Sequence, residues 1–90
     1  MRSVRRTGGF NRDLKRLNRR GYDLKRLASM LDALARGESL PVVARPHPLK
    51  GEWKGYWEFH VAPDWLVIYK LTAVEVLLAR TGTHADLFRE

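Results

Sequence analysis

The sequence predicts an α+β fold in which a helical hairpin packs on one face of a small antiparallel sheet. Residues 1–40 are basic and place apolar residues at helical spacing, whereas residues 52–90 hold every Trp and most of the β-branched residues in alternating runs. Residues 41–51 form a Pro-containing connector between the two parts. A chain of 90 residues suffices for one small core, so we expect a single domain over residues 1–90.

Two amphipathic helices are predicted in the N-terminal part. Apolar residues recur at i, i+4 and i+7 in the first helix, namely Phe10, Leu14 and Leu17. They recur at i, i+3, i+7 and i+10 in the second helix, namely Leu24, Leu27, Leu31 and Leu34. Asp23 is placed to cap the second helix, and Gly21 and Gly37 stand where helices are expected to end. This pattern predicts the hairpin.

Three strands are predicted after the connector. Alternation over residues 53–61 indicates a half-buried strand, with Trp53 and Trp57 in phase with Phe59 on the core side. Residues 62–64 supply turn chemistry, residues 65–71 resemble a central strand, and residues 74–81 a third strand. The three strands form an antiparallel meander. Shorter strands are expected near Val4 and at Val42-Val43.

The meander brings distant polar residues to one edge of the sheet. Because the first strand ends where the second begins and the third ends, we expect His60, Asp64 and Arg80 to lie close together. His84 follows Arg80 closely, and His47 lies in the connector, so all three histidines can meet. Histidine exchanges protons near neutral pH, and arginine stabilises charge on a phosphoryl oxygen. The set suits metal-free cleavage of an RNA phosphodiester.

Local patterns also allow simpler interpretations of these residues. A histidine in a small domain is commonly a surface or hydrogen-bonded residue, and Asp64 is explained by the turn alone. Trp65, Tyr56 and Phe88 are candidates to stack on an unpaired base, although core packing explains Trp65 equally well. The spacing of the histidines matches no short metal-binding motif, so no metal is expected.

Composition restricts the compartment and the partners. Lys and Arg exceed Asp and Glu by 17 to 10, a net charge of +7, which favours polyanionic partners. The absence of cysteine excludes disulfides, thiolate zinc sites and cysteine nucleophiles. The N-terminus has no apolar signal region, and the longest apolar run, residues 65–69, is too short to cross a membrane. We therefore expect a cytoplasmic protein with no membrane contact.

Two C-terminal stretches carry a family resemblance. The run HPLKGEWKGYWEFHVAPDWLVIYKL, residues 47–71, followed by ARTGTHADLF, residues 79–88, resembles the YafQ branch of the RelE superfamily of bacterial toxins. The resemblance implies a toxin of a type II toxin–antitoxin pair, which cleaves mRNA in the ribosomal A site without a cofactor. It also implies a cognate antitoxin that covers the basic surface, with operator DNA bound only through the antitoxin complex.

The same resemblance assigns roles to individual residues. It implies the catalytic set His47, His60, Asp64, Arg80 and His84. His84 is the expected general acid, and Arg80 the residue that stabilises the phosphate.

The general base stays open among His47, His60 and Asp64, with Glu58 as an additional carboxylate. Contacts to the substrate are expected from Lys50, Lys54, Glu58, Trp65 and Phe88. Trp57 stands where a polar or basic residue is expected in the family, which leaves the codon preference open.

Two other functions remain as alternatives. One is a non-catalytic basic protein that binds RNA or the ribosome, or that serves as a corepressor with its antitoxin. The other is a metal-dependent hydrolase.

Overall fold

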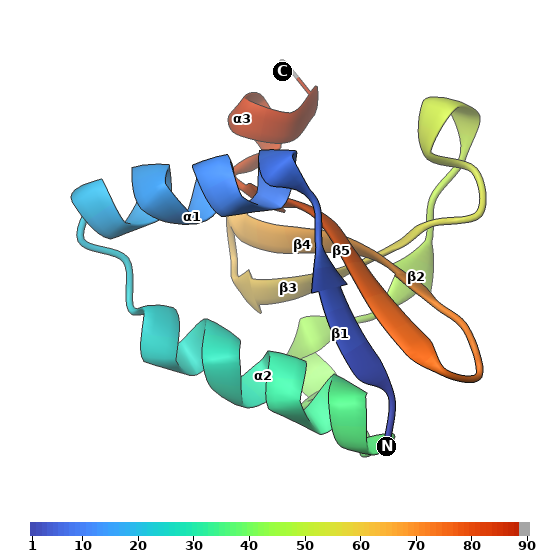
Figure 1. Ribbon diagram of the computed structural model, residues 1–90. Coiled ribbons are helices and arrows are strands. Elements are labelled where there is room, and N and C mark those ends of the chain that lie inside the picture. The colour runs from blue at the N-terminus through green and yellow to red at the C-terminus, as the bar shows by residue number, and fades with distance from the viewer. Residues whose placement is uncertain (89–90) are drawn as a thin grey trace.

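The computed structural model describes residues 1–88 and has the predicted α+β class. Its elements are β1 (Ser3–Arg6), α1 (Gly8–Arg19), α2 (Leu24–Arg36), β2 (His47–Pro48), β3 (Trp57–Ala62), β4 (Trp65–Leu71), β5 (Glu75–Gly82) and α3 (His84–Phe88). Single 3-10 turns at Val42–Ala44 and Gly51–Trp53 flank β2. The strands form one sheet in the order β1-β5-β4-β3-β2 (Figure 1).

The sheet is mixed rather than antiparallel, which corrects the predicted topology. The meander of β3, β4 and β5 is present as expected, and β2 adds an antiparallel edge through His47↔Glu58. In contrast, β1 runs parallel to β5, with Ser3 opposite Glu75. The two strands are far apart in the chain: α1 and α2 carry it from β1 to β2 at the opposite edge of the sheet, and the antiparallel strands then return it to β5.

Two further strand predictions are wrong in detail. The segment Val42-Val43 forms a 3-10 turn whose two valine side chains are exposed. The strand expected from residue 53 begins only at Trp57, because Gly51 and Gly55 adopt positive φ angles of 66° and 92° that interrupt extended backbone. Trp57 is also 41% exposed and is not a core residue.

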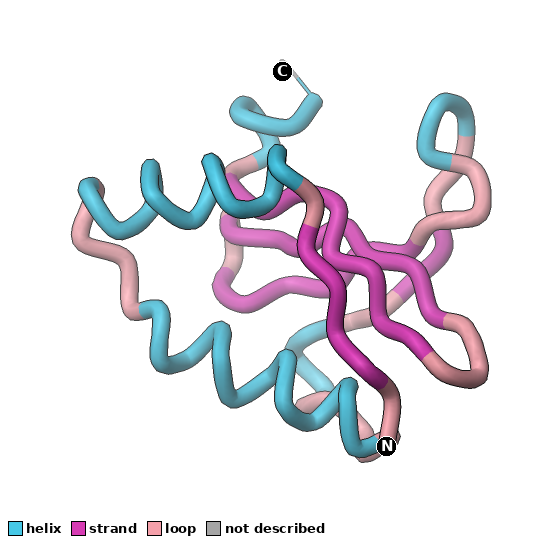
Figure 2. Tube along the Cα trace, viewed as in Figure 1, coloured by secondary structure: helices cyan, strands magenta, loops and turns pink. Residues whose placement is uncertain are grey.

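The helices begin and end largely where capping residues predict. The Thr7 side chain accepts a hydrogen bond from the backbone of Phe10 and donates one to the carbonyl of Ala79, so it both caps α1 and ties it to β5. Asp23 caps α2, and Gly37 ends it in the left-handed region at φ 75°. Both helices cover the same face of the sheet (Figures 1 and 2).

Alternating side chains give the sheet two different faces. The helix-covered face packs β-strand residues against α1 and α2, with a core that includes Phe10, Leu27, Phe59, Val67 and Leu78. The opposite face carries a smaller apolar cluster of Leu66, Ile68 and Ala79, partly covered by Leu49, Trp53, Tyr56, Leu87 and Phe88. Glu58 and His60 alternate with Phe59 and therefore lie on this second face. Among residues 1–88, no helix has the length and apolar character needed to span a bilayer.

Candidate active site

The structure brings all three histidines together on the face of the sheet opposite to α1 and α2. The ring centroids of His47 and His60 are 6.5 Å apart, and those of His60 and His84 are 5.8 Å apart. His47 comes from β2, His60 from β3 and His84 from the start of α3. The convergence expected from the meander is therefore present.

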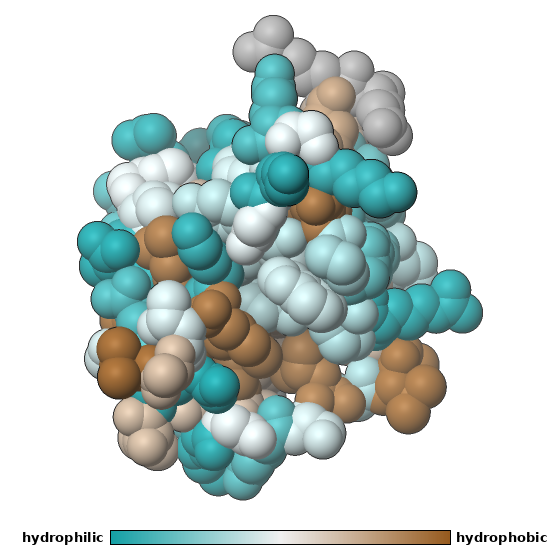
Figure 3. All heavy atoms as spheres, turned by 90° about the vertical axis from the view of Figure 1, so that its right-hand side faces the viewer, coloured by the Kyte–Doolittle hydropathy of each residue, from teal (hydrophilic) through white to brown (hydrophobic). Residues whose placement is uncertain are grey.

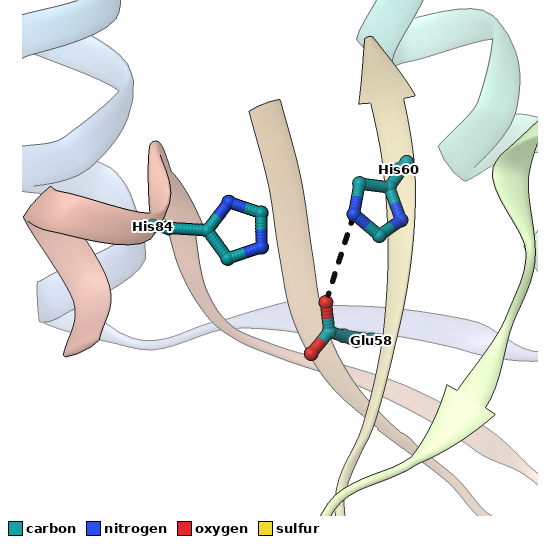
Figure 4. A group of neighbouring side chains, drawn as sticks. All are labelled: Glu58, His60 and His84. Atoms are coloured by element: carbon teal, nitrogen blue, oxygen red, sulfur yellow. Dashed lines mark ion pairs between the residues drawn. The ribbon is translucent and has the colours of Figure 1, made fainter. Parts of the chain in front are cut away.

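Asp64 fixes the orientation of His84. One carboxylate oxygen of Asp64 lies 2.7 Å from Nδ1 of His84 and also accepts the backbone N–H of His84 at 3.0 Å. These two bonds lower the pKa of Asp64 below its ordinary value, because they favour the ionised carboxylate. With Nδ1 engaged, Nε2 is the nitrogen that faces the cluster (Figure 4).

Glu58 is a buried carboxylate between the other two histidines. Its side chain is 8% exposed, and its two oxygens lie 3.5 Å from Nε2 of His47 and 4.0 Å from Nε2 of His60. Nδ1 of His47 lies 2.9 Å from the carbonyl of Arg45, which can accept its proton. Nδ1 of His60 is buried and has no partner among the described residues.

A capping box sets the start of α3 and thereby the position of His84. Thr83 and Asp86 exchange hydrogen bonds between each side chain and the other's backbone N–H, at 3.0 and 3.1 Å. A Cβ at Gly82, where φ is 155°, would lie 2.9 Å from a carboxylate oxygen of Asp86, so the close turn into α3 requires glycine. Arg20, the C-cap residue of α1, then holds Asp86 with two hydrogen bonds of 2.8 and 3.1 Å.

Arg80 of β5 is held in place by a buried partner. Two of its nitrogens donate to the carboxylate of Asp13 at 2.7 and 3.1 Å, and Asp13 is only 1% exposed. This pairing raises the pKa of Arg80 above its ordinary value, so its positive charge is secure. Asp13 also accepts the backbone N–H of Thr81, which anchors α1 to β5.

Arg80 lines a hollow next to the histidines. Lys50 and Phe88 line the same hollow, together with Glu52, Trp53, Asp86 and Leu87. The ring of Phe88 lies 6.3 Å from that of His84, one helical turn away. Lys54 follows the 3-10 turn at Gly51–Trp53 and does not line this hollow.

Trp65 is a core residue, which corrects its expected role as a base contact. It is 4% exposed, packs edge to face on Tyr22 with centroids 5.0 Å apart, and donates its indole N–H to Thr81 at 3.0 Å. Alternation places Trp65 on the helix-covered face, so no base can reach its ring in this conformation.

Sequence reasoning missed two residues that support the site. Asp13 sits among apolar helix positions and was not singled out, although a lone acid in a basic helix is a signal for a buried ion pair. Asp86 was also missed, although the spacing Thr83-x-x-Asp86 is a recognisable capping box.

The fold and the site together define a small basic protein with a histidine–carboxylate cluster on its open sheet face. Residues 2–89 match the model of the family described as bacterial toxin of type II toxin–antitoxin system, YafQ. The mRNA interferase toxin YafQ of Escherichia coli strain K12 is 42% identical over 88 residues, which cover 97% of this chain and 96% of that protein. The chain belongs to the YafQ family of type II toxins.

Solved structures agree in fold over nearly the whole chain. YafQ in the crystal structure of the E. coli DinJ–YafQ toxin–antitoxin complex has 42% identity and a TM-score of 0.89, with 97% of each chain covered. A metal-bound toxin from Helicobacter pylori has 36% identity and a TM-score of 0.91, with 98% of this chain and 100% of that chain covered.

Proposed function

We propose that this toxin is a metal-free endoribonuclease that cleaves mRNA in the ribosomal A site and so inhibits translation. The observation that carries the proposal is the convergence of His47, His60 and His84 with two carboxylates on an open face. The family membership supports it, since a relative at 42% identity is named an mRNA interferase.

The reaction needs a base, an acid and a cation around one phosphodiester. The base removes the proton of a ribose 2′-hydroxyl, the 2′-oxygen attacks phosphorus, and the acid protonates the departing 5′-oxygen. The products are a 2′,3′-cyclic phosphate and a 5′-hydroxyl end. Arg80 stands four residues before His84 and carries a secure charge for the phosphorane oxygens.

His84 serves as the general acid in this scheme. Its Nδ1–H donates to Asp64, which holds the ring and leaves Nε2 toward the reacting atoms. Asp64 is then a positioning residue for His84 rather than the base, because its oxygen is already occupied twice. The base is His47 or His60, and Glu58 lies beside both of them.

Substrate contacts follow from the residues around the cluster. Phe88 stacks on a base beside His84, and Lys50 contacts the RNA backbone from the adjoining hollow. Lys54 contacts a more distant phosphate. These contacts and the ribosome position the RNA for cleavage.

The partners of this toxin are a cognate antitoxin, the ribosome and mRNA. The E. coli relative is crystallised with the antitoxin DinJ, which supports an antitoxin for this chain. Operator DNA is bound only through the toxin–antitoxin complex. The net charge of +7 suits acidic and nucleic-acid partners alike. A toxin that acts on ribosomes and mRNA works in the cytoplasm.

The test compares one mRNA in two states. Purified protein is added to an mRNA positioned on ribosomes and to the same mRNA without ribosomes, and new 5′ ends are mapped by primer extension. The proposal predicts cuts within codons, in the reading frame, only on ribosomes. Ribosome binding that weakens with salt while no new ends form would instead establish the non-catalytic alternative.

A further inference from the structure

We propose that a second hollow, at the open edge of β3, binds the nucleotide on the 5′ side of the cut through Arg26 and Arg45. The identity of the occupant rests on the proposed RNA cleavage, because a strand that is cut at the histidine cluster must be held on both sides of the scissile phosphate. The occupant is therefore one ribonucleotide, with its phosphate, sugar and base.

This hollow lies beside the histidine cluster and is separate from the one that Arg80 and Phe88 line. Its volume is about 570 Å³, which is enough for a single nucleotide. We call it the valine hollow, after its lining by Arg26, Val42, Val43, Arg45, His60 and Val61. Within the described part of the chain, β2 pairs with β3 only as far as Glu58, so no strand covers β3 from His60 onward. The edge of the sheet is therefore open at this point.

The two hollows lie at opposite ends of the histidine cluster. The ring of His60, in the valine hollow, lies 5.8 Å from that of His84 (Figure 4), and the ring of His84 lies 6.3 Å from that of Phe88, in the other hollow. In the proposed scheme His84 protonates the departing 5′-oxygen, so the leaving nucleotide lies on the side of Phe88. The nucleotide that carries the attacking 2′-hydroxyl then lies on the side of His60, in the valine hollow.

The two arginines of the valine hollow are available for a phosphate. Arg26 and Arg45 are exposed, and neither forms an ion pair with a carboxylate of the described residues. In contrast, Arg20, Arg36 and Arg80 each have a carboxylate partner. Guanidinium groups bind phosphate oxygens through charge-assisted hydrogen bonds. Two such groups without a carboxylate partner favour an anionic occupant.

The backbone of Arg45 connects the valine hollow to the histidine cluster. Among the residues that the structure describes, it is the one non-glycine residue with a positive φ, 46°, which is unfavourable for a long side chain. In this conformation its carbonyl lies 2.9 Å from Nδ1 of His47, while its side chain lines the hollow. Such conformations persist where the surrounding structure requires them and are concentrated at functional sites. Arg45 therefore positions His47 and lines the hollow at the same time.

The walls of the valine hollow favour a sugar and base over a free anion. Val42 and Val43 are 93% and 69% exposed, and an occupant that covers them removes apolar surface from water. Aliphatic walls contact any base, so we expect little base preference at this position. An acidic and apolar protein segment is the competing occupant. The presence of His60 favours RNA, because only RNA brings a ribose 2′-hydroxyl to this histidine.

Two mononucleotides test the assignment, because they carry the nucleoside on opposite sides of the phosphate. With its phosphate at the histidine cluster, adenosine 3′-monophosphate places its nucleoside in the valine hollow, whereas adenosine 5′-monophosphate places it beside Phe88. NMR spectra of the full-length chain are expected to show shifts of the methyl signals of Val42, Val43 and Val61 with the 3′-monophosphate at millimolar concentration. The 5′-monophosphate is expected to shift the ring signals of Phe88 instead.

Arginine variants test the phosphate contacts. Arg26→Gln and Arg45→Asn are each expected to weaken binding of the 3′-monophosphate by about 5-fold and to leave binding of the 5′-monophosphate unchanged. Asparagine tolerates the left-handed conformation, so Arg45→Asn removes the charge without a change of the backbone. Arg36→Gln, on the same helix as Arg26 and paired with Asp32, is the matched control and is expected to bind as the parent does.

A cleavage assay on ribosome-bound mRNA separates the subsite from the proposed function. The double variant Arg26→Gln/Arg45→Asn is expected to raise KM at least ~10-fold with little change in kcat, since its contacts lie away from the reacting atoms. Glu75→Gln, which breaks an ion pair with Arg5 at the far end of the sheet, is the control and is expected to cleave as the parent does.

Three results would refute a part of this proposal. Valine methyl signals that stay unshifted with the 3′-monophosphate, or a double variant with the binding and KM of the parent, would overturn the subsite. Shifts caused by a peptide of alternating Glu and Val, and not by the 3′-monophosphate, would assign the hollow to a protein partner and overturn it as well. A parent that binds the 3′-monophosphate in the hollow but never cleaves mRNA would refute the proposed function while supporting the nucleotide site.

Discussion

At the scale of single residues, the Asp64–His84 pair is the most specific feature of the candidate site. A turn residue and a histidine 20 positions later meet at 2.7 Å. The lowered pKa of Asp64 keeps it ionised at every pH at which a histidine titrates. Asp64 therefore holds the ring of His84 throughout the working range of an acid–base reaction.

The replacement Asp64→Asn tests this positioning role. The amide keeps the shape but loses the charge, so we expect cleavage to slow by about 10-fold or more, within the range known for acid–base groups. Because Asp64 acts through His84, the pH dependence of the cleavage rate is also expected to shift, whereas binding to ribosomes is unchanged. An unchanged pH profile with a slower rate would indicate a purely structural role.

Trp65 is expected to contribute to stability and not to cleavage. Trp65→Phe retains an aromatic ring against Tyr22 but removes the hydrogen bond to Thr81, so the free energy of unfolding is expected to fall by about 1 kcal/mol. Denaturant unfolding measures this loss. Cleavage per folded molecule is expected to stay at the parent level, and a specific rise in KM for ribosome-bound mRNA would restore Trp65 as a base contact.

Much of the residue-level site followed from the sequence. The meander rule predicted a shared edge for His60, Asp64 and Arg80, and the closeness of His84 to Arg80 in sequence brought His84 to the same edge. The structure shows His84 in contact with Asp64 and near His60. Burial is harder to predict: whether Trp65 packs or is exposed depends on which face the register gives it. The partnership of Asp13 with Arg80 depends on a helix docking angle that no local pattern encodes.

At the scale of secondary-structure elements, the short helix α3 is the feature on which the site depends. Five residues do not form a stable helix alone, so its position comes from the capping box and from the bonds between Arg20 and Asp86. The bond from Arg20 is the main reason that the pKa of Asp86 lies far below its usual range. The end of α1 thus fixes the start of α3 through Arg20 and Asp86, and thereby fixes the position of His84.

Asp86→Asn is expected to destabilise the protein in a pH-dependent way. At neutral pH the loss of the cap and the ion pair is expected to lower the free energy of unfolding by about 1 kcal/mol. This corresponds to a fall of about 4–8 °C in melting temperature. Because the pKa of Asp86 is lowered on folding, its stabilising effect is present above the ordinary carboxyl pKa of about 4 and is lost as pH falls below that value. The difference between parent and variant is therefore expected to shrink from pH 7 to pH 2 in thermal melts. A difference that stays constant with pH would contradict the ionic explanation.

The sequence predicted most elements but not their complete arrangement. The spacing of apolar residues and the capping residues located both long helices, and alternation located the three strands of the meander. The parallel pairing of β1 with β5 is non-local, since Val4 and Val76 lie opposite each other across most of the chain. The local alternation at Trp53 was misleading because the positive φ angles of Gly51 and Gly55 outweigh strand propensity there.

At the scale of the whole molecule, the excess of positive charge is the dominant property. Exposed basic residues of α1, such as Arg12 and Arg19, lie outside the histidine cluster. Apolar side chains are also exposed, among them Val42, Val43 and Val74. Figure 3 shows apolar patches in the lower part of one face among hydrophilic side chains. A polyanionic partner with apolar segments matches such a surface.

The double variant Arg12→Gln/Arg19→Gln tests the collective role of this charge. If both residues contact phosphates, binding to ribosomes is expected to weaken at low salt. The plot of log affinity against log salt concentration is also expected to become less steep, by about 1.4 in the magnitude of its slope. The cleavage rate at saturating protein is expected to stay unchanged. Filter binding over a series of KCl concentrations measures the slope, and an identical slope would show that these two arginines belong to a solvated face.

We propose above that His84 transfers a proton in mRNA cleavage. Its most direct test adds the parent, His84→Ala and Glu75→Gln to a translating extract at equal folded concentration and maps new mRNA 5′ ends by primer extension. We expect in-frame cuts within codons for the parent and Glu75→Gln, and a loss of cleavage of at least ~100-fold for His84→Ala with an unchanged circular dichroism spectrum. Parent-like cutting by folded His84→Ala would show that His84 is not the general acid.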